Sequence, residues 1–402
     1  MRIVIVDLHC NGFMVRTLGQ IADKWVSTAK HVFFLEEALK EGYEVVDFIT
    51  GKQSELWIGK NSLLLNRMEA LYVLKKNGLK NKILCITDPS AVREDDLVIF
   101  YVHKNDAIDL HTVSGHKYCN VNHFFKMHSQ RGIAFSEILV EDGFEGYICE
   151  SDVLNDSPFF REYLPVKKKK ILLMPYVAEN RFRRIKIFNK RINKALALGS
   201  VGVESDKIQK VYGTRQLHPM RRELFDRKNE NNEQIECMIE EFVFPKERYP
   251  VGEKDSRMVK FLKRFYNHFY NTYNSPFRRN GKNASYYNKD RVEQLNDYKM
   301  FIYPEEVTGV PALGFVEGMS CGCAYIGLDS LMYTKIGMMP GVHYIGYDGT
   351  YDDMVEKIRY YQEHDTELEE IAENGYQFVK EHLSAEAVFK QFIKQVEEKI
   401  ND

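Results

Sequence analysis

The clearest structural pattern in the chain is YKMFIYPEEVTGVPALGFVEGMSCGCAYIG, which runs from Tyr298 to Gly327. Its first part, Tyr298 to Pro304, is an apolar run typical of a strand buried on both faces. Leu313 to Gly322 has helical spacing and ends in a glycine, and Ala324 to Leu328 predicts another strand. Strand, helix and strand in this order predict a parallel sheet covered by helices. We therefore expect an α/β domain here.

Two acids and a turn of small residues connect the predicted strand to the predicted helix. Glu305 and Glu306 follow the strand directly. The residues of the turn are Thr308, Gly309, Val310, Pro311 and Ala312. Exposed amides at the start of a helix favour an anion, and Glu317, expected one to two turns into the helix, is placed to accept two hydroxyls such as those of a ribose. The small residues expected to let this helix approach the sheet are Gly318, Ser320, Gly322 and Cys323.

This stretch resembles the retaining GT-B glycosyltransferases marked by a Glu-x7-Glu motif, the group of glycosyltransferase family 4. In that group a strand ending in Pro is followed by Glu, a Gly-rich turn and a helix of approximate sequence E-A-M-A-C-G-x-P-V-I. The segment EGMSCGCAYI, from Glu317 to Ile326, is similar to it, and Ile371 to Ile393 resembles the family's closing helices. The resemblance implies two Rossmann-like doubly wound domains facing a central cleft. It also implies a C-terminal helix that crosses back to the N-terminal domain.

The resemblance implies roles for the glutamates. The family's second motif glutamate binds the nucleotide ribose and corresponds to Glu317. Eight positions upstream stands Gly309 instead of an acid, and Glu306 and Glu305 lie eleven and twelve residues upstream. We expect a longer turn here, with Glu306 as the catalytic candidate and Glu305 as a donor-binding candidate. Which of the two replaces the first motif glutamate stays open, as does the alternative that both only face water.

Arginines are the expected counter-charges for a diphosphate without a metal, because the leaving group gains negative charge in the transition state. The family's Gly-Arg and Lys-Gly pattern is missing after Leu198. The segment VYGTRQLHPMRREL, Val211 to Leu224, stands there instead. Arg221 is the catalytic candidate, and the other cations considered are Arg215, Arg222, Arg278 and Lys282. For each of them a solvated loop arginine or lysine is the alternative.

The N-terminal half predicts a second doubly wound sheet. The predicted strands are residues 2–8, 43–50, 82–87, 96–102 and 117–121, with a helix over 31–42. Gly12 follows the first strand and matches the family's glycine where donor phosphates approach the backbone. His123 corresponds to the family's histidine near donor sugar and acceptor and is a catalytic candidate, with a packed core histidine as the alternative. His9 and Arg16 flank Gly12 and are placed to touch the acceptor.

Composition limits the remaining function classes. The chain has 402 residues, 44% hydrophobic and 28% charged, which favours two or three globular domains. A net charge of -2 gives no general attraction for nucleic acid, and the absence of a P-loop or GxGxxG fingerprint disfavours nucleotide hydrolysis and hydride transfer. Seven cysteines without a CxxC pair predict reduced thiols in a cytoplasmic protein without a metal site. Neither a signal peptide nor a membrane span is expected.

The sharpest change in composition is residues 161–194, with twelve Lys or Arg and two Glu. A solvated linker explains it, and a surface for peripheral contact with anionic lipid or a phosphorylated acceptor is the alternative. The predicted domains are residues 1–168 for the acceptor, 169–380 for the nucleotide sugar, and 381–402 as the C-terminal helix. Gly375 and Ser384 are expected to interrupt the closing helices.

The resemblance implies an enzyme that needs no cofactor. It would move a sugar from a nucleoside diphosphate sugar to a hydroxyl of a glycan or lipid-linked acceptor, with retention, in polysaccharide biosynthesis. A non-catalytic GT-B-like module that binds a glycan or a partner protein is the alternative, and a sugar phosphate synthase or an epimerase is a third. The base, the sugar and the acceptor stay open.

Overall fold

The computed structural model describes residues 1–10, 14–16, 30–50, 63–100, 112–120, 144–157, 170–202, 209, 214–241, 252, 254–256, 258–260, 262–263, 266 and 290–401. The chain forms two compact units. The first consists of Met1–Phe124, Asp142–Tyr147 and Val243–Asn288, and the second of Phe125–Glu141, Ile148–Phe242 and Lys289–Asp402. The boundaries expected near residues 168 and 380 stay predictions.

The first sheet has seven strands in the order β3-β2-β1-β4-β5-β6-β7. Its strands are β1 (Ile3–Val6), β2 (Val45–Phe48), β3 (Ile83–Ile86), β4 (Leu97–Phe100), β5 (His116–Asn120), β6 (Gly146–Cys149) and β7 (Lys170–Leu173). The helices are η1 (Leu8–Cys10), α2 (Val32–Lys40), α3 (Leu63–Lys76), η2 (Pro89–Ala91) and α6 (Val153–Asp156). The pairs among the first five strands are parallel, and the division between the units runs through β6. The N-terminal strand predictions are confirmed, each within a few residues.

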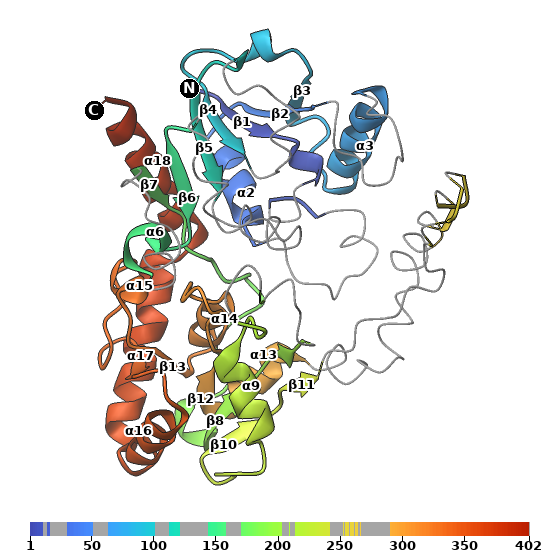
Figure 1. Ribbon diagram of the computed structural model, residues 1–402. Coiled ribbons are helices and arrows are strands. Elements are labelled where there is room, and N and C mark those ends of the chain that lie inside the picture. The colour runs from blue at the N-terminus through green and yellow to red at the C-terminus, as the bar shows by residue number, and fades with distance from the viewer. Residues whose placement is uncertain are drawn as a thin grey trace. The chain divides into compact units, whose positions relative to one another are not determined.

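The second sheet has five parallel strands in the order β10-β8-β12-β13-β14. Figure 1 labels β8, β10, β12 and β13 among them. The strands are β8 (Ile192–Ala197), β10 (Ile235–Cys237), β12 (Tyr298–Ile302), β13 (Ala324–Leu328) and β14 (Ile345–Tyr347); the short β9 (Ser200–Val201) pairs with β11 (Glu240–Glu241). The helices are η4 (Phe188–Lys190), α9 (Pro219–Asp226), α13 (Arg291–Asp297), α14 (Gly314–Ser320), α15 (Leu331–Thr334), α16 (Tyr351–Glu363), α17 (Asp365–His382) and α18 (Ala385–Asn401). Two parallel sheets with covering helices confirm the predicted α/β class.

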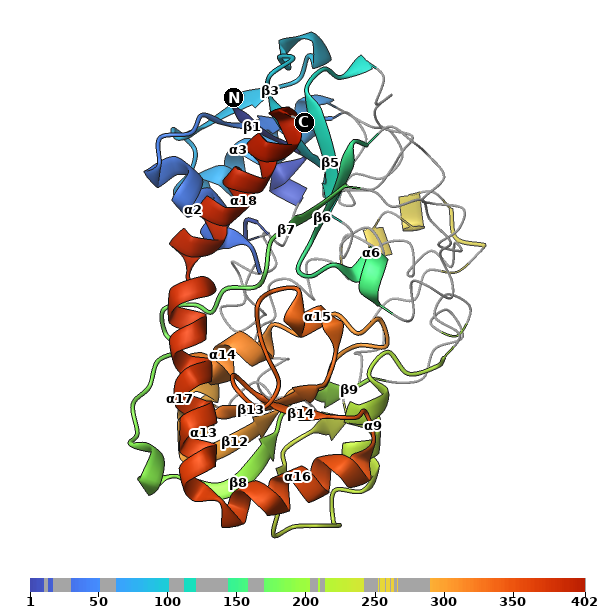
Figure 2. The same cartoon turned by 90° about the vertical axis from the view of Figure 1, so that its left-hand side faces the viewer.

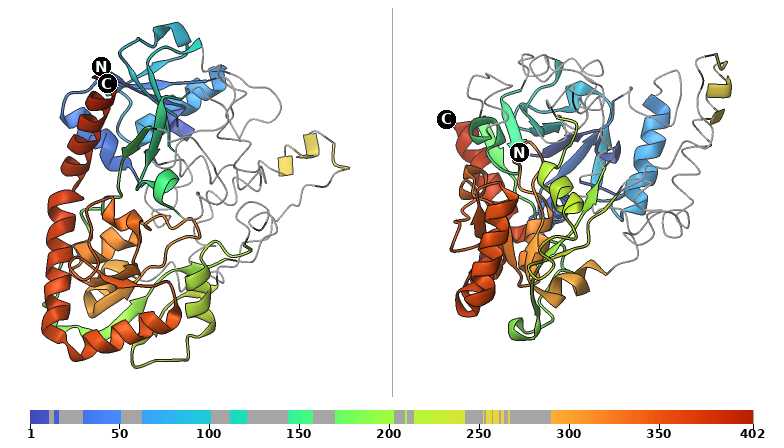
Figure 3. Two further views of the ribbon diagram at one scale, coloured as in Figure 1. Left: turned by 60° about the vertical axis from the view of Figure 1, so that its left-hand side comes forward. Right: turned by 60° about the horizontal axis from the view of Figure 1, so that its bottom comes forward.

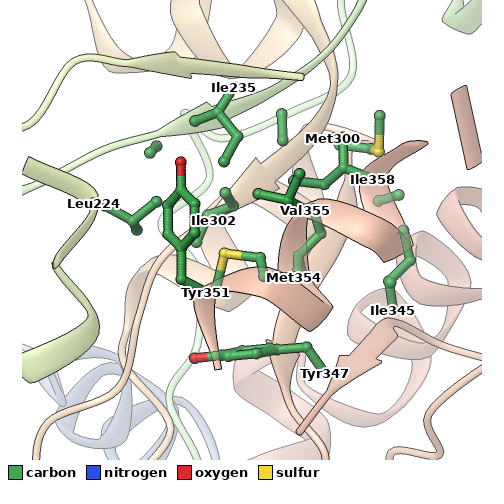
Figure 4. Packing of buried hydrophobic residues seen from close by; sticks show 14 of the residues in the cluster. Leu224, Ile235, Met300, Ile302, Ile345, Tyr347, Tyr351, Met354, Val355 and Ile358 are labelled. Carbon is green, nitrogen blue, oxygen red and sulfur yellow. The ribbon is translucent and has the colours of Figure 1, made fainter. Parts of the chain in front are cut away.

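Alternating side chains of β12 build the layers on both faces of this sheet. Met300 and Ile302 belong to the buried cluster that includes Met354 and Ile358 of α16 (Figure 4). Phe301, between them in sequence, points to the opposite face, where a Cβ built on Gly318 of α14 would lie 2.3 Å from its ring. The sheet is therefore covered on both faces, as its continuous apolar strands predict.

Gly318 explains why α14 lies so close to β12. Since only a hydrogen occupies the place of a side chain, the helix backbone rests directly on the Phe301 ring, and Gly314 does the same against Tyr303. The close approach expected from Gly318 is confirmed. Gly375 does not end a helix as expected: it lies inside α17, where a Cβ would come within 2.5 Å of the His343 carbonyl oxygen.

The closing helices pack on strands of both sheets. Figures 2 and 3 show α16 and α17 meeting at an angle, with α16 across β8 and β14 and α17 along β13 and α14. Ser384 precedes α18, and its Oγ accepts a hydrogen bond from the Ala387 amide at 3.3 Å. Gln395 of α18 exchanges two hydrogen bonds with the backbone of Leu173 in β7, at 2.9 and 3.1 Å. Among the described helices, none combines the length and apolar character that a bilayer span requires.

The order of the five strands predicts where a ligand binds. After β8 the chain adds β10 on one side, and then β12, β13 and β14 on the other. The direction of winding therefore reverses between β8 and β12. In open parallel sheets, ligands bind outside the carboxyl ends of the strands at such a reversal.

Candidate functional site

Three loops meet beyond the carboxyl ends of β8 and β12. The turn after β12 is tied to the segment before α9 by a hydrogen bond from the Val307 amide to the Leu217 carbonyl, at 2.8 Å. Within the turn, the Gly309 amide donates to the Glu306 carbonyl at 2.8 Å. The Ser157 hydroxyl donates to the Thr308 carbonyl at 2.5 Å. These contacts give the turn that carries the predicted donor site a defined position.

Arg221, in the first turn of α9, lies at the reversal point itself. Its Nη1 donates to the Ser200 carbonyl at 3.3 Å and its Nη2 to the Pro304 carbonyl at 3.4 Å, so the guanidinium bridges the loops after β8 and β12. The residue is buried, and its guanidinium lies 5.1 Å from the Tyr303 ring centroid. Gly199, with a φ of +136°, makes room, because a Cβ there would lie 2.8 Å from Nε.

Arg221 differs from other arginines of this unit in its partners. Within the described ranges it forms no ion pair, and its buried Nε has no hydrogen-bond partner. Arg191 is equally buried, but its Nη2 donates to the Lys186 and Cys321 carbonyls at 2.9 and 2.7 Å. Arg222 pairs with Asp226 one turn along α9, at 2.8 Å. Arg221 is thus a buried cation with hydrogen-bonding capacity to spare, which an anion would complete.

Glu317 is the fourth residue of α14 and lies in its first turn, nearer the start of the helix than expected. It is 3% exposed, and its Oε2 lies 3.4 Å from Nη1 of Arg291, the first residue of α13. Burial raises the pKa of Glu317, while the charges of Arg291 and Arg181 lower it. The carboxylate therefore faces cations and does not point into packed hydrocarbon.

Glu305 and Glu306 have different surroundings. Oε1 of Glu305 accepts hydrogen bonds from the Tyr333 hydroxyl at 2.5 Å, the Tyr325 hydroxyl at 3.1 Å and the Leu328 amide at 3.1 Å. Burial raises the pKa of Glu305, and these hydrogen bonds lower it. The side chain of Glu306 is 36% exposed, and its Oε1 lies 4.0 Å from Nε2 of His218.

Sequence reasoning missed Arg291, Tyr325 and Tyr333. A signal existed for Tyr325, since it stands where the resembling motif has Val. Arg291 lies 26 residues before Glu317, and no motif links the two. Tyr333 lies 28 residues after Glu305 in a segment without a recognisable pattern.

The other candidates lie partly within the described residues. In the turn, Thr308, Val310 and Pro311 are buried, and Gly309 and Ala312 are half-buried. Arg215 is exposed, in the segment before α9. Gly12, His123, Arg278 and Lys282 lie outside the described residues. Across the described ranges no three His, Cys, Asp or Glu side chains gather so that they could hold a metal ion.

Several basic residues of the 161–194 stretch have partners inside the protein. Arg184 pairs with Glu373 at 2.7 Å, Arg181 with Glu179 at 2.9 Å, and Lys186 with Asp297. Part of this positive charge is thus compensated locally. Residues 161–169 lie outside the described part of the chain. Contact of this stretch with a membrane stays a prediction.

Comparison with known proteins supports the fold. Residues 252–394 match a family model described as "Glycosyl transferase-like". Over the whole fold, a glycosyltransferase from Rickettsia africae ESF-5 is similar, with a TM-score of 0.52 and 10% identity over 100% of this chain and 99% of that chain. The chain has the GT-B fold.

Two further relatives are informative. The structure of Anabaena Alr3699/HepE in complex with UDP-glucose has a TM-score of 0.50 to this GT-B chain, with 11% identity over 99% of this chain and 100% of that one. Protein O-glucosyltransferase 2 of Danio rerio is 37% identical over 68 residues, which are 16% of this chain and 14% of that protein. The matched part is thus a small fraction of the curated relative. The family-model segment contains Glu305, Arg291 and Glu317 but ends short of Arg221 on the N-terminal side.

Proposed function

We propose that this chain is a glycosyltransferase that binds a nucleoside diphosphate sugar at the carboxyl ends of β8, β12 and β13. The proposal rests chiefly on Arg221, a buried guanidinium without an acidic partner among the described residues, at the reversal point of the sheet. A diphosphate is the anion that a GT-B fold would bring to such a cation. The complex of HepE with UDP-glucose and the glycosyltransferase-like match of residues 252–394 support this choice of donor.

The carboxylates would then bind the uncharged parts of the donor, which are its ribose and its sugar. Glu317 would accept the ribose hydroxyls, with Arg291 favouring its charged form. Glu305 or Glu306 would stand beside the sugar, at the end of β12. Arg215 and the amides of residues 308–312 would add contacts to the phosphates, and Gly12 and His123 are the candidates of the other unit. Arg222 is a weaker candidate, since Asp226 already pairs with it.

We propose that transfer proceeds with retention. The bond between the anomeric carbon and the leaving diphosphate oxygen breaks, and the acceptor oxygen bonds to the same face of that carbon. The acceptor's proton passes to the leaving phosphate oxygen. In this scheme the protein positions the reactants and stabilises the diphosphate charge, which requires a guanidinium more than a strong base. No metal or cofactor would be needed for that charge.

The acceptor we propose is a hydroxyl of a glycan or of a lipid-linked sugar, in the biosynthesis of a surface polysaccharide. The reaction would then take place in the cytoplasm. Residues 161–194 are the surface where we would look for peripheral contact with a membrane, because their excess of basic residues favours anionic lipid.

The donor can be tested by thermal shift with a panel of UDP, GDP, CMP and dTDP sugars. A ligand that binds only the folded state raises the melting temperature, and the rise grows with the logarithm of its concentration relative to its dissociation constant. We expect one nucleotide class to stabilise the wild-type protein and to lose that effect in Glu317→Ala. A wild-type protein that none of these compounds stabilises would argue against the proposal. Release of nucleoside diphosphate with transfer of the sugar then separates an enzyme from a GT-B-like binding module.

A further inference from the structure

We propose that Tyr325 and Tyr333 are positioning residues that hold one oxygen of Glu305 so that its other oxygen is presented to a hydroxyl of the donor's sugar. This inference rests on the proposed function and deepens it. It assigns the sugar side of the site to Glu305 and not to Glu306. It also names the residues that fix the carboxylate there.

The hydrogen bonds that other described residues donate to Glu305 are one-sided; its own backbone also contributes one. The two tyrosine hydroxyls and the Leu328 amide all donate to Oε1, and Oε2 receives none of these three bonds. The two phenol oxygens lie 2.7 Å apart, and the Tyr303 carbonyl oxygen lies 3.3 Å from the Tyr325 hydroxyl. Because each phenol carries a single proton, these two acceptors compete with Oε1 for the proton of Tyr325, whereas Tyr333 donates to Oε1 at 2.5 Å. A carboxylate anchored through one oxygen has a fixed direction for the lone pairs of the other.

Both phenol rings are themselves immobilised by packing. Tyr325 and Tyr333 are fully buried, with ring centroids 5.8 Å apart, and Phe315 of α14 packs against both at 5.9 and 5.7 Å. Tyr325 extends from β13 and Tyr333 from α15. A strand and a helix thus each direct a hydroxyl at one carboxylate oxygen. Apolar side chains would fill the same space without this polar contact.

Glu306 has no comparable support. Its side chain is 36% exposed, and its one described ionic neighbour, His218, lies 4.0 Å away. A side chain with this freedom pays an entropic penalty each time it orients toward a substrate. Glu305 has already lost that freedom in the folded protein.

The sequence departs from the resembling motif at two positions that bear on this arrangement. The resembling motif has Val where Tyr325 stands, and an acid eight positions before Glu317 where Gly309 stands. In this inference Glu305 stands in for the acid that is absent at position 309. The Tyr325 hydroxyl lies 3.1 Å from Glu305, so the two departures from the motif meet in the folded chain. The tyrosine accompanies the displaced glutamate.

The test compares Tyr325→Phe, Tyr333→Phe and the double variant with the wild type, using UDP and UDP-glucose in isothermal titration. UDP lacks the sugar, so its affinity should stay unchanged. The advantage of UDP-glucose over UDP, which is the ratio of their two affinities, should fall about three- to tenfold for one lost hydrogen bond. Tyr344→Phe is the matched control: it removes a buried hydroxyl from the same ring cluster, where Tyr344 bonds to the Leu328 carbonyl and not to Glu305.

A pH series separates positioning from simple loss of packing. The phenol hydrogen bonds favour the ionised carboxylate, so their removal raises the pKa of Glu305 further. The advantage of UDP-glucose requires the ionised form and is lost as the pH falls through that pKa. The loss should therefore begin at a higher pH in Tyr333→Phe than in the wild type. This difference should disappear when Glu305→Gln is present in both proteins.

Two results would overturn the inference: an unchanged ratio of UDP-glucose to UDP affinity in the double variant, or an equal change in Tyr344→Phe. If the wild type binds neither compound, the choice of donor fails. Thermal melting still tests whether Tyr325 and Tyr333 hold the Glu305 carboxylate. Tyr333→Phe should then destabilise the protein more at pH 8 than at pH 5, because only the ionised carboxylate needs the donor. Equal destabilisation at both pH values, as expected for Tyr344→Phe, would show that the tyrosines do not hold Glu305.

Discussion

Glu305 and Glu317 are two buried glutamates of the same unit, and their negative charges are compensated in different ways. Glu317 faces the guanidinium of Arg291, whose side chain is 34% exposed. Glu305 is surrounded by neutral donors, with Tyr325 and Tyr333 as the closest side chains. Burial raises the pKa of both carboxyls, but nearby cations are the main counterweight for Glu317 and hydrogen bonds for Glu305.

Under the proposed function, this difference suits the two carboxylates to different tasks. A cation that water also reaches compensates charge without fixing direction, so Glu317 can adjust to a pair of ribose hydroxyls. Oriented neutral dipoles in dry surroundings fix direction strictly, so Glu305 suits a single, geometrically defined hydroxyl. The two sites should therefore respond differently to charge removal, to shifts of α14 and to pH.

The largest effect is expected for the cation proposed to bind the diphosphate. Arg221→Gln should lower turnover about 10²- to 10³-fold, the typical loss when one group that stabilises developing negative charge is removed. Steady-state kinetics with the donor found in the thermal-shift screen measures it. Arg222→Gln, which breaks the surface pair with Asp226, should cost far less. Equal losses of turnover in the two variants would mean that the buried Arg221 contributes no more to the reaction than the surface residue Arg222.

Glu317→Ala should weaken UDP binding about 10- to 100-fold, the range for losing a hydrogen bond to a charged group. The melting temperature should stay close to that of the wild type, because Arg291 is exposed enough to be hydrated. Isothermal titration and a thermal melt of the same sample check both parts. An unchanged UDP affinity contradicts the assignment of the ribose site.

Gly318→Ala tests whether the two sites can be moved separately. The added methyl would lie 2.3 Å from the Phe301 ring, so α14 must shift, at a cost of about 1–3 kcal/mol of stability. UDP affinity should fall with it, while the affinity ratio of UDP-glucose to UDP should change less, since the tyrosines beside Glu305 extend from β13 and α15 and touch α14 through Phe315. Gly202→Ala, where a Cβ meets nothing within 4 Å, is the control for the substitution itself. Equal melting temperatures for the two variants would refute the close packing.

Arg291→Gln should change the pH dependence of UDP binding at Glu317 alone. Removing the cation raises the pKa of Glu317 further, and binding that needs the carboxylate is lost as the pH falls through that pKa. Titrations from pH 5 to pH 8 should therefore show the loss at a higher pH than in the wild type. The pH at which the affinity ratio of UDP-glucose to UDP falls should stay as in the wild type. A shift of both curves would indicate that the two carboxyls titrate together.

The smallest effect is expected from a chelator. If arginines supply the counter-charge for the diphosphate, EDTA should leave turnover and UDP affinity unchanged. Activity lost with EDTA and restored by Mg²⁺ or Mn²⁺ would reject the metal-free donor site.

The local pattern of the sequence predicted the elements around the site closely. The predicted strand Ala324–Leu328 coincides with β13, and the predicted helix Leu313–Gly322 contains α14. These elements depend on apolar spacing and glycine positions, which act over a few residues. The position of Glu317 within its helix was wrong by part of a turn, because the start of α14 has no capping side chain to mark it.

The partners of the site residues could not be predicted in the same way. The sequence does not predict the different surroundings of Arg221 and Arg222: the first is buried between two carbonyls, and the second pairs with Asp226 on the surface of α9. Burial depends on which side of the helix meets the sheet, and on Gly199 leaving room for the guanidinium. Single-residue patterns do not contain that information.

The sequence by itself determined the parallel α/β layers and the presence of two acids and several arginines next to one predicted strand end. Only the tertiary structure decided which acid is held and by what. The donors to Glu305 come from Tyr325, Leu328 and Tyr333, which lie 20, 23 and 28 residues away along the chain. Hydrogen bonds act over about 3 Å in space, and folding alone brings such distant residues within that range.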